Sequence, residues 1–276
     1  MTVTLSGFAD EISADLDSQL AVLAEQSIRH LELRSVWSVN VADLDDAQVA
    51  RIGRALDGAG VAVSAIGSPI GKIPVDAPLG PELDRLRRIA DIAAALGTPL
   101  VRVFSFFLPK GRSPAEFSGP VLDRMAALAG IAEERGLVLA HENEKEIYGD
   151  VPGRCAEIIR EVGSPALRAT FDAANFVQCG VAPHTEAYPL LAPYIEYLQV
   201  KDALAATGAV VPAGMGDGQV RLTLAALAEA GFAGFVSLEP HLAVAGRFGG
   251  FSGPEEFTRA ASALKGLLDG LGMSWR

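Results

Sequence analysis

Eight short apolar segments recur at a broadly even spacing along the chain, and each is followed by a longer segment with helical periodicity. Val61-Ala-Val-Ser-Ala-Ile66 and Leu137-Val-Leu-Ala140 are typical of these runs, which suit parallel strands covered on both faces. Strands alternating with helices predict a parallel sheet. We expect the strands at 3–8, 29–33, 61–66, 100–104, 137–142, 167–172, 195–200 and 234–239.

Proline and glycine mark the boundaries of the expected helices. Pro81 opens one helical segment and Gly97 ends it, while Pro114 and Gly136 bound another. Pro254 opens the last segment. Proline in the first turn and glycine beyond the last are typical of helix ends.

The alternation and the length of 276 residues predict a (β/α)8 TIM barrel, with residues 1–276 forming a single domain. A doubly wound open sheet is the structural alternative. It would usually carry a glycine-rich, phosphate-binding turn after its first strand, and Gly7-Phe-Ala-Asp-Glu11 is not such a turn.

The charge and hydropathy of the chain indicate which kinds of binding partner to expect. The chain has 34 Asp and Glu against 23 Lys and Arg, which argues against a nucleic-acid partner. No apolar run reaches the roughly 18 residues of a membrane span, and the N-terminus lacks the pattern of a signal peptide. Cys155, expected in a helix, and Cys179, expected in a loop, indicate neither a disulfide framework nor a thiolate metal site. We therefore expect a cytoplasmic protein with no membrane partner.

Oxygen-bearing side chains end the last four expected strands, namely Glu142, Asp172, Gln199 and Glu239. Barrel enzymes carry their reactive groups at this end of the strands, so the four side chains should converge. A lone acidic residue there is more often a helix N-cap or part of an ion pair, but four in phase are not explained that way. Clustered carboxylates repel one another, and a divalent cation relieves the repulsion. Oxygen donors favour Mg²⁺ or Mn²⁺.

Four motifs resemble the sugar phosphate isomerase/epimerase family of xylose isomerase-like barrels. They are His141-Glu-Asn-Glu-Lys-Glu-Ile-Tyr-Gly-Asp150, Thr170-Phe-Asp-Ala-Ala-Asn-Phe176, Val200-Lys-Asp-Ala203 and Ser237-Leu-Glu-Pro-His241. The resemblance implies one metal ion held by Glu142, Asp172, position 199 and Glu239. The family's usual His is Gln199 here, and an amide is a weaker ligand than imidazole for Zn²⁺ or Co²⁺. Mn²⁺ or Mg²⁺ is therefore favoured, with Zn²⁺ and Co²⁺ as alternatives.

The resemblance also implies an isomerase or epimerase that removes a proton next to a carbonyl of a small sugar or polyol-derived substrate. Glu142 and Glu239 would be the catalytic acid and base. An inosose-type dehydratase on the same scaffold is one alternative, and Gln199 keeps open a metal-free sugar-binding descendant. A DNA-repair endonuclease of the same superfamily is disfavoured by the acidic charge and by only four histidines. Such barrels often form homo-oligomers, but no residue here indicates one.

Four further residues are candidate substrate contacts, and each has a structural alternative. Asn175 would contact substrate or support a ligand. Lys201 would contact substrate oxygens or form a salt bridge, and His241 would contact substrate or orient Glu239. Arg102 would line the pocket, although an ion pair inside the barrel is preferred.

Other polar and glycine-rich segments lie near the same ends of the expected strands. The glycine-rich segment 212–218 is expected to be a lid or turn rather than a phosphate cradle, and Asp202 should orient Lys201 or this loop. Glu144 and Lys145 are expected to form an exposed pair. Glu32 and Arg34, at the end of the second strand, are expected to line the pocket.

Overall fold

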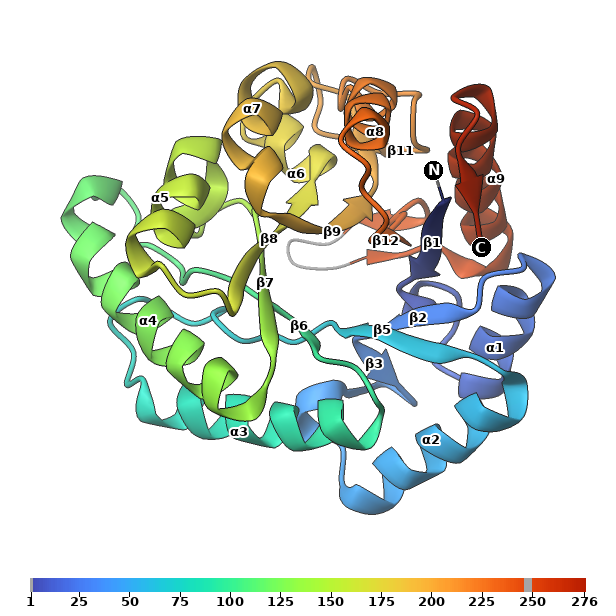
Figure 1. Cartoon of the computed structure of the whole chain (residues 1–276), viewed down its shortest axis with the longest axis horizontal. Helices are drawn as coiled ribbons and strands as arrows, with labels where there is room; N and C mark the ends of the chain where they lie inside the picture. The colour runs from blue at the N-terminus through green and yellow to red at the C-terminus, as the bar shows by residue number, and fades with distance from the viewer. Residues whose placement is uncertain (1, 246–249) are drawn as a thin grey trace.

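A computed structural model describes residues 2–245 and 250–276 and confirms all eight predicted strands (Figure 1). They are β1 (Thr2–Gly7), β2 (His30–Leu33), β5 (Ala62–Ile66), β6 (Leu100–Val103), β7 (Val138–Glu142), β8 (Leu167–Asp172), β9 (Ile195–Val200) and β12 (Phe235–Leu238). Neighbouring strands in this set pair in parallel. The fold is an α/β barrel that forms a single domain.

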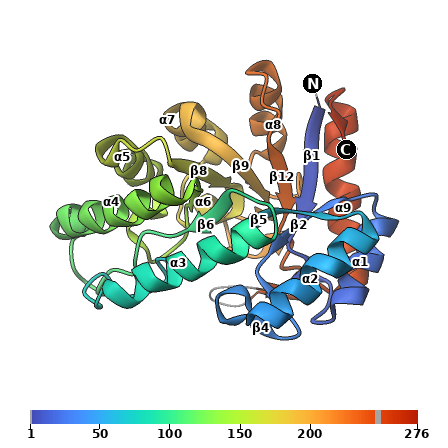
Figure 2. The ribbon, with the colours of Figure 1, turned by 60° about the horizontal axis from the view of Figure 1, so that its bottom comes forward.

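The sheet closes on itself between its first and second strands. Its order is β15-β1-β12-β9-β8-β7-β6-β5-β2, and an isolated parallel bridge between Phe8 and Glu32 joins the β1 side to β2. The open-sheet alternative is therefore wrong. The short strand β15 (Ser274–Trp275) pairs with β1, so the two ends of the chain lie side by side (Figures 1 and 2).

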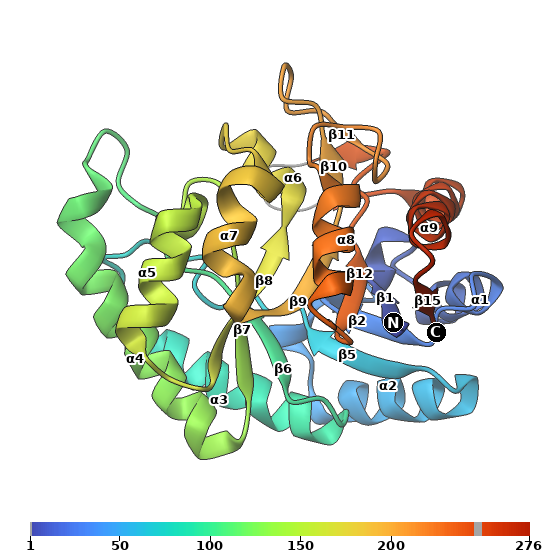
Figure 3. The ribbon, with the colours of Figure 1, turned by 45° about the horizontal axis from the view of Figure 1, so that its top comes forward.

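Helices surround the barrel on its outside (Figures 1 and 3). They are α1 (Leu16–Glu25), α2 (Asp46–Ala59), α3 (Gly80–Ala95), α4 (Ser118–Arg135), α5 (Pro152–Val162), α6 (Ala173–Gln178), α7 (Tyr188–Leu191), α8 (Val220–Glu229) and α9 (Gly253–Gly270). Pro114 begins a 3₁₀ turn rather than α4 itself, because Ser113 and Glu116 cap that turn. The helix α4 ends at Gly136, as predicted, and this glycine adopts the left-handed conformation.

Apolar side chains fill the space between the strands and the helices, with Leu5, Phe171 and Leu264 among the fully buried ones. Cys155 lies in α5 and Cys179 directly follows α6, and both are free thiols. Among the described residues, no helix combines the length and apolar character that a membrane crossing requires.

Short antiparallel strand pairs lie at the end of the barrel where the eight parallel strands finish. β3 (Ser35–Val36) with β4 (Val39–Asn40), β10 (Asp202–Ala203) with β11 (Val210–Val211), and β13 (Val244–Ala245) with β14 (Gly250–Phe251) follow β2, β9 and β12, respectively. The polar residues predicted to form the site belong to this same end.

Candidate metal centre

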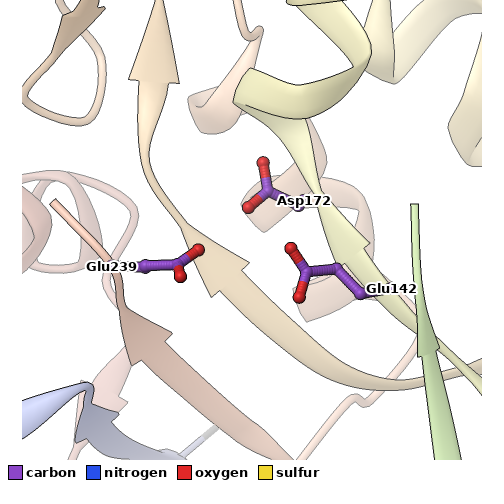
Figure 4. A group of neighbouring side chains, drawn as sticks. All are labelled: Glu142, Asp172 and Glu239. Atoms are coloured by element: carbon purple, nitrogen blue, oxygen red, sulfur yellow. The ribbon is translucent and has the colours of Figure 1, made fainter. Parts of the chain in front are cut away.

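Three of the four predicted metal ligands converge in the structure. Glu142 ends β7, Asp172 ends β8 and Glu239 follows β12, and all three are buried. One oxygen from each lies within 4.8 Å of the others, and the carboxyl groups face a common space (Figure 4). Carboxylates this close in a buried site repel one another unless positive charge lies beside them or one of them is protonated.

Two asparagines fix the first two carboxylates. The Asn143 side chain donates a 2.9 Å hydrogen bond to the Asp172 carbonyl and accepts one of 2.9 Å from the Asp172 N–H. Asn175 donates its N–H to Asp172 Oδ1 (2.8 Å) and its Nδ2 to Glu142 Oε1 (3.0 Å). Asp172 is thus also the N-cap of α6, and Asn175 supports Glu142. Asn143 was not predicted as a site residue, although it follows Glu142 directly in the sequence.

Gln199 stands opposite Asp172 in the register of β8 and β9. Its Nε2 donates to Glu32 Oε1 at 3.0 Å, and Ser237 Oγ donates to Glu32 Oε2 at 3.0 Å. The Gln199 Oε1 atom is buried without a hydrogen-bond partner among the described residues. Because Glu32 takes up the amide nitrogen, the oxygen is left as the atom available to a cation. Burial raises the pKa of Glu32 to about 8.

Lys201 bridges two members of the triad. Its buried Nζ lies 2.8 Å from Asp172 Oδ2 and 2.5 Å from Glu239 Oε2. Burial by itself would lower the pKa of Lys201, but the charges of Asp172 and Glu239 raise it well above its usual value. Of the two expectations for Lys201, the salt bridge describes this structure.

Glu239 and Glu142 lie in different electrostatic surroundings. Glu239 Oε1 lies 2.9 Å from Arg34 Nη1 and 3.4 Å from His241 Nε2. Although burial opposes its ionisation, Lys201, His241 and Arg34 hold its pKa well below the usual value. Burial raises the pKa of Glu142 to about 7, despite Arg102 Nη1 lying 3.2 Å from its Oε2.

Two further acidic residues, Asp10 and Glu11, pair with the cationic side chains that contact Glu239. Arg34 lies 2.7 Å from Asp10 Oδ2 and 3.0 Å from Glu11 Oε1, and His241 Nε2 lies 3.1 Å from the same Glu11 oxygen. His241 therefore contacts Glu239 and Glu11, as the orienting alternative expected. Asp10 and Glu11 were not predicted to belong to the site. Their place after the first strand, at the same mouth, was the available signal.

The side chains of Arg102 and Glu144 are both buried. Besides Glu142, the Arg102 guanidinium lies over the rings of Phe8 and Phe104, so the ion pair inside the barrel describes it. Glu144 does pair with Lys145, at 3.2 Å, as predicted, and it also pairs with Lys72 at 3.6 Å. The prediction that Glu144 is exposed is wrong, because its side chain is buried.

The glycine-rich loop 212–218 wraps around a carboxylate of the protein itself. Asp202 accepts hydrogen bonds from the backbone N–H groups of Gly214 (2.9 Å), Gly216 (3.0 Å), Gly218 (2.7 Å) and Ala203 (2.8 Å). These amides are committed to Asp202 rather than presented to a phosphate, so the turn interpretation holds. A Cβ at Gly216 would lie 2.5 Å from Asp202 Oδ1, which accounts for glycine there.

The donor set fits a hard divalent cation. Glu142 Oε2, Asp172 Oδ2 and Gln199 Oε1 are buried and accept no hydrogen bond among the described residues, although the first two lie beside Arg102 and Lys201. Carboxylate and amide oxygens are the ligands preferred by Mg²⁺ and Mn²⁺.

Comparison with known proteins places the chain among related barrels. The model of a family described as xylose isomerase-like TIM barrel matches residues 21–267. The 2-epi-5-epi-valiolone 7-phosphate 2-epimerase of Actinoplanes sp. is 38% identical over 146 residues. That match covers 51% of this chain and 50% of the relative, so the aligned part spans about half the length of the curated relative.

Solved structures share the fold at low sequence identity. A D-tagatose 3-epimerase-like protein superposes with a TM-score of 0.80 at 17% identity, over 98% of each chain. A xylose isomerase-like TIM barrel protein from Mycobacterium smegmatis, in complex with magnesium, gives a TM-score of 0.71 at 20% identity, over 98% of this chain and 96% of that one. At such identities the likeness establishes the fold alone.

Proposed function

Because the chain belongs to the xylose isomerase-like TIM barrel family, we propose that it is a divalent-metal-dependent isomerase or epimerase of a small sugar or polyol-derived substrate. The observation that carries the proposal is the meeting of Glu142, Asp172 and Glu239 oxygens within 4.8 Å. The similarity to a 2-epimerase over about half of the chain supports the reaction class. The magnesium complex of a protein with the same fold supports a metal of this kind.

The proposed ligands are Glu142, Asp172, Gln199 and Glu239. Their all-oxygen donor set favours Mn²⁺ or Mg²⁺ over Zn²⁺ or Co²⁺. When bound, the ion polarises a substrate carbonyl and its neighbouring hydroxyl.

The protein's own groups then supply the proton transfers. Glu142 ends β7 and Glu239 directly follows β12, and the two face the common space from two sides. One takes the proton from the carbon next to the carbonyl, and the other returns a proton to the opposite face. Asn175 donates its Nδ2 to Glu142 Oε1, while Glu142 Oε2 lies beside Arg102 and accepts no hydrogen bond among the described residues. We further propose that Lys201, His241, Arg102 and Asn175 contact substrate hydroxyls from the surrounding walls.

The test is solvent-deuterium exchange. Protein stripped with a chelator and reloaded with Mn²⁺, Mg²⁺, Co²⁺ or Zn²⁺ is incubated with ketopentoses, ketohexoses and inososes in D₂O. We expect metal-dependent deuterium uptake at one carbon of one substrate class, read by NMR and mass spectrometry. Loss of water from the product would instead identify the dehydratase.

Glutamine variants test the two glutamates. Glu142→Gln and Glu239→Gln should each lower exchange by about 10²–10⁴-fold while keeping the fold, because each removes one proton-transfer group. Glu161→Gln, at an exposed position paired with Arg160, is the matched control and should retain full activity. Full exchange in both active-site variants, or exchange that is independent of metal, contradicts the proposal.

A further inference from the structure

We propose that Lys201 is a built-in competitor for the metal ion, so that metal binding must displace its ammonium group from Asp172 and Glu239. This inference rests on the proposed function, since it takes the carboxylate triad as the metal site. It goes further by assigning to one residue the control of metal affinity and of the stability of the metal-free protein.

The geometry places the ammonium between two of the proposed ligands. Lys201 Nζ lies 2.8 Å from Asp172 Oδ2 and 2.5 Å from Glu239 Oε2. A divalent ion bound to these carboxylates at about 2.1 Å would enter the same small space. The ion and the ammonium are both cations, and their side-by-side burial would restore the repulsion that the site is built to avoid.

The surroundings explain why the ammonium occupies this position. Lys201 and both of its carboxylate partners are buried. Removing one partner of a buried ion pair leaves an uncompensated charge, which is strongly destabilising. Lysine has a flexible four-carbon stem and a compact charge, so it can withdraw when a stronger cation arrives. The guanidinium of Arg34 approaches Glu239 from its other oxygen, at 2.9 Å, and need not move.

The experiment compares metal binding by wild type and Lys201→Met, which keeps an unbranched side chain of similar length but removes the ammonium group. Isothermal titration of the metal-free proteins with Mn²⁺ should show at least a tenfold tighter Kd in the variant. In the presence of chelator the variant should unfold at a lower temperature than wild type, and saturating Mn²⁺ should remove the deficit. Lys110→Met, at an exposed loop position, makes the same charge change and should bind Mn²⁺ like wild type.

A second measurement applies if the metal-free Lys201→Met variant does not fold. Lys201→Met purified with Mn²⁺ should release the ion to excess chelator at least tenfold more slowly than wild type. Equal or weaker Mn²⁺ binding, or equal or faster release, overturns the role of Lys201 while leaving the metal site in place. Failure of both wild type and Lys201→Met to bind any divalent ion would instead remove the proposed function.

Discussion

Replacing Asp202 by alanine should destabilise the protein by about 2–6 kcal/mol, because one carboxylate serves four backbone N–H groups. The hydrogen bonds from Ala203 and Gly218 are buried, and each buried donor left without an acceptor costs about 1–3 kcal/mol. Those from Gly214 and Gly216 are half-buried, so water can replace part of them. Asp202→Asn retains one acceptor oxygen and should lose less than Asp202→Ala.

Urea denaturation followed by circular dichroism measures the loss, and thermal unfolding provides a second reading. For a domain of this size, 1 kcal/mol corresponds to about 2–4 °C in Tm. Asp217→Asn is the matched control, since its carboxylate accepts one exposed hydrogen bond from the Ala205 N–H and should change stability by under about 0.5 kcal/mol. If Asp202→Ala costs no more than this control, the loop does not depend on its buried carboxylate.

Two other substitutions test the ligand set and its support. Gln199→His should shift preference toward Zn²⁺ or Co²⁺ over Mn²⁺ by at least tenfold in competition titrations, because imidazole binds the softer ions better; an unchanged preference contradicts Gln199 as a ligand. Arg34→Met should cost about 3–5 kcal/mol in thermal unfolding, because Glu239 and Glu11 lose a buried charged partner. A cost under about 1 kcal/mol would show that Lys201 and His241 compensate the charges of Glu239 and Glu11 without Arg34.

The barrel strands and the proposed ligands could be predicted because they obey local rules. Parallel strands covered on both faces read as apolar runs, and the last residue of each run fixes where a side chain enters the mouth. Glu142 and Asp172 each end such a strand, and Glu239 follows one directly. Their meeting point therefore followed from strand boundaries alone, without knowledge of any contact.

The roles of Asp10 and Glu11 could not be predicted in the same way. They lie in the 3₁₀ turn η1 (Ala9–Glu11) beyond β1, and their function depends on Arg34 reaching them from the next strand. Lys201 illustrates a different limit. A salt bridge and a substrate contact both use the same ammonium, so residue type and strand alternation leave the choice open until its neighbours are placed.

The strand β2 and Arg34 directly after it contribute no proposed ligand, yet Glu32 and Arg34 position two of the ligands. Glu32 accepts a hydrogen bond from the Gln199 amide nitrogen, which leaves the amide oxygen for the proposed cation, and Arg34 pairs with Glu239. Asn143 and Asn175 perform the corresponding task for Asp172 and Glu142.

Each proposed ligand is thus oriented by a residue outside the ligand set, an arrangement that keeps donor atoms in place before a metal arrives. The contact between Gln199 and Glu32 makes the orientation of the side chain at position 199 depend on the acceptor at residue 32. An imidazole at 199 would offer a ring nitrogen on either side, whereas a glutamine offers an oxygen to the metal only if a neighbour accepts its NH₂ group. The acceptor Glu32 near the end of β2 therefore leaves the Gln199 oxygen for the proposed metal ion.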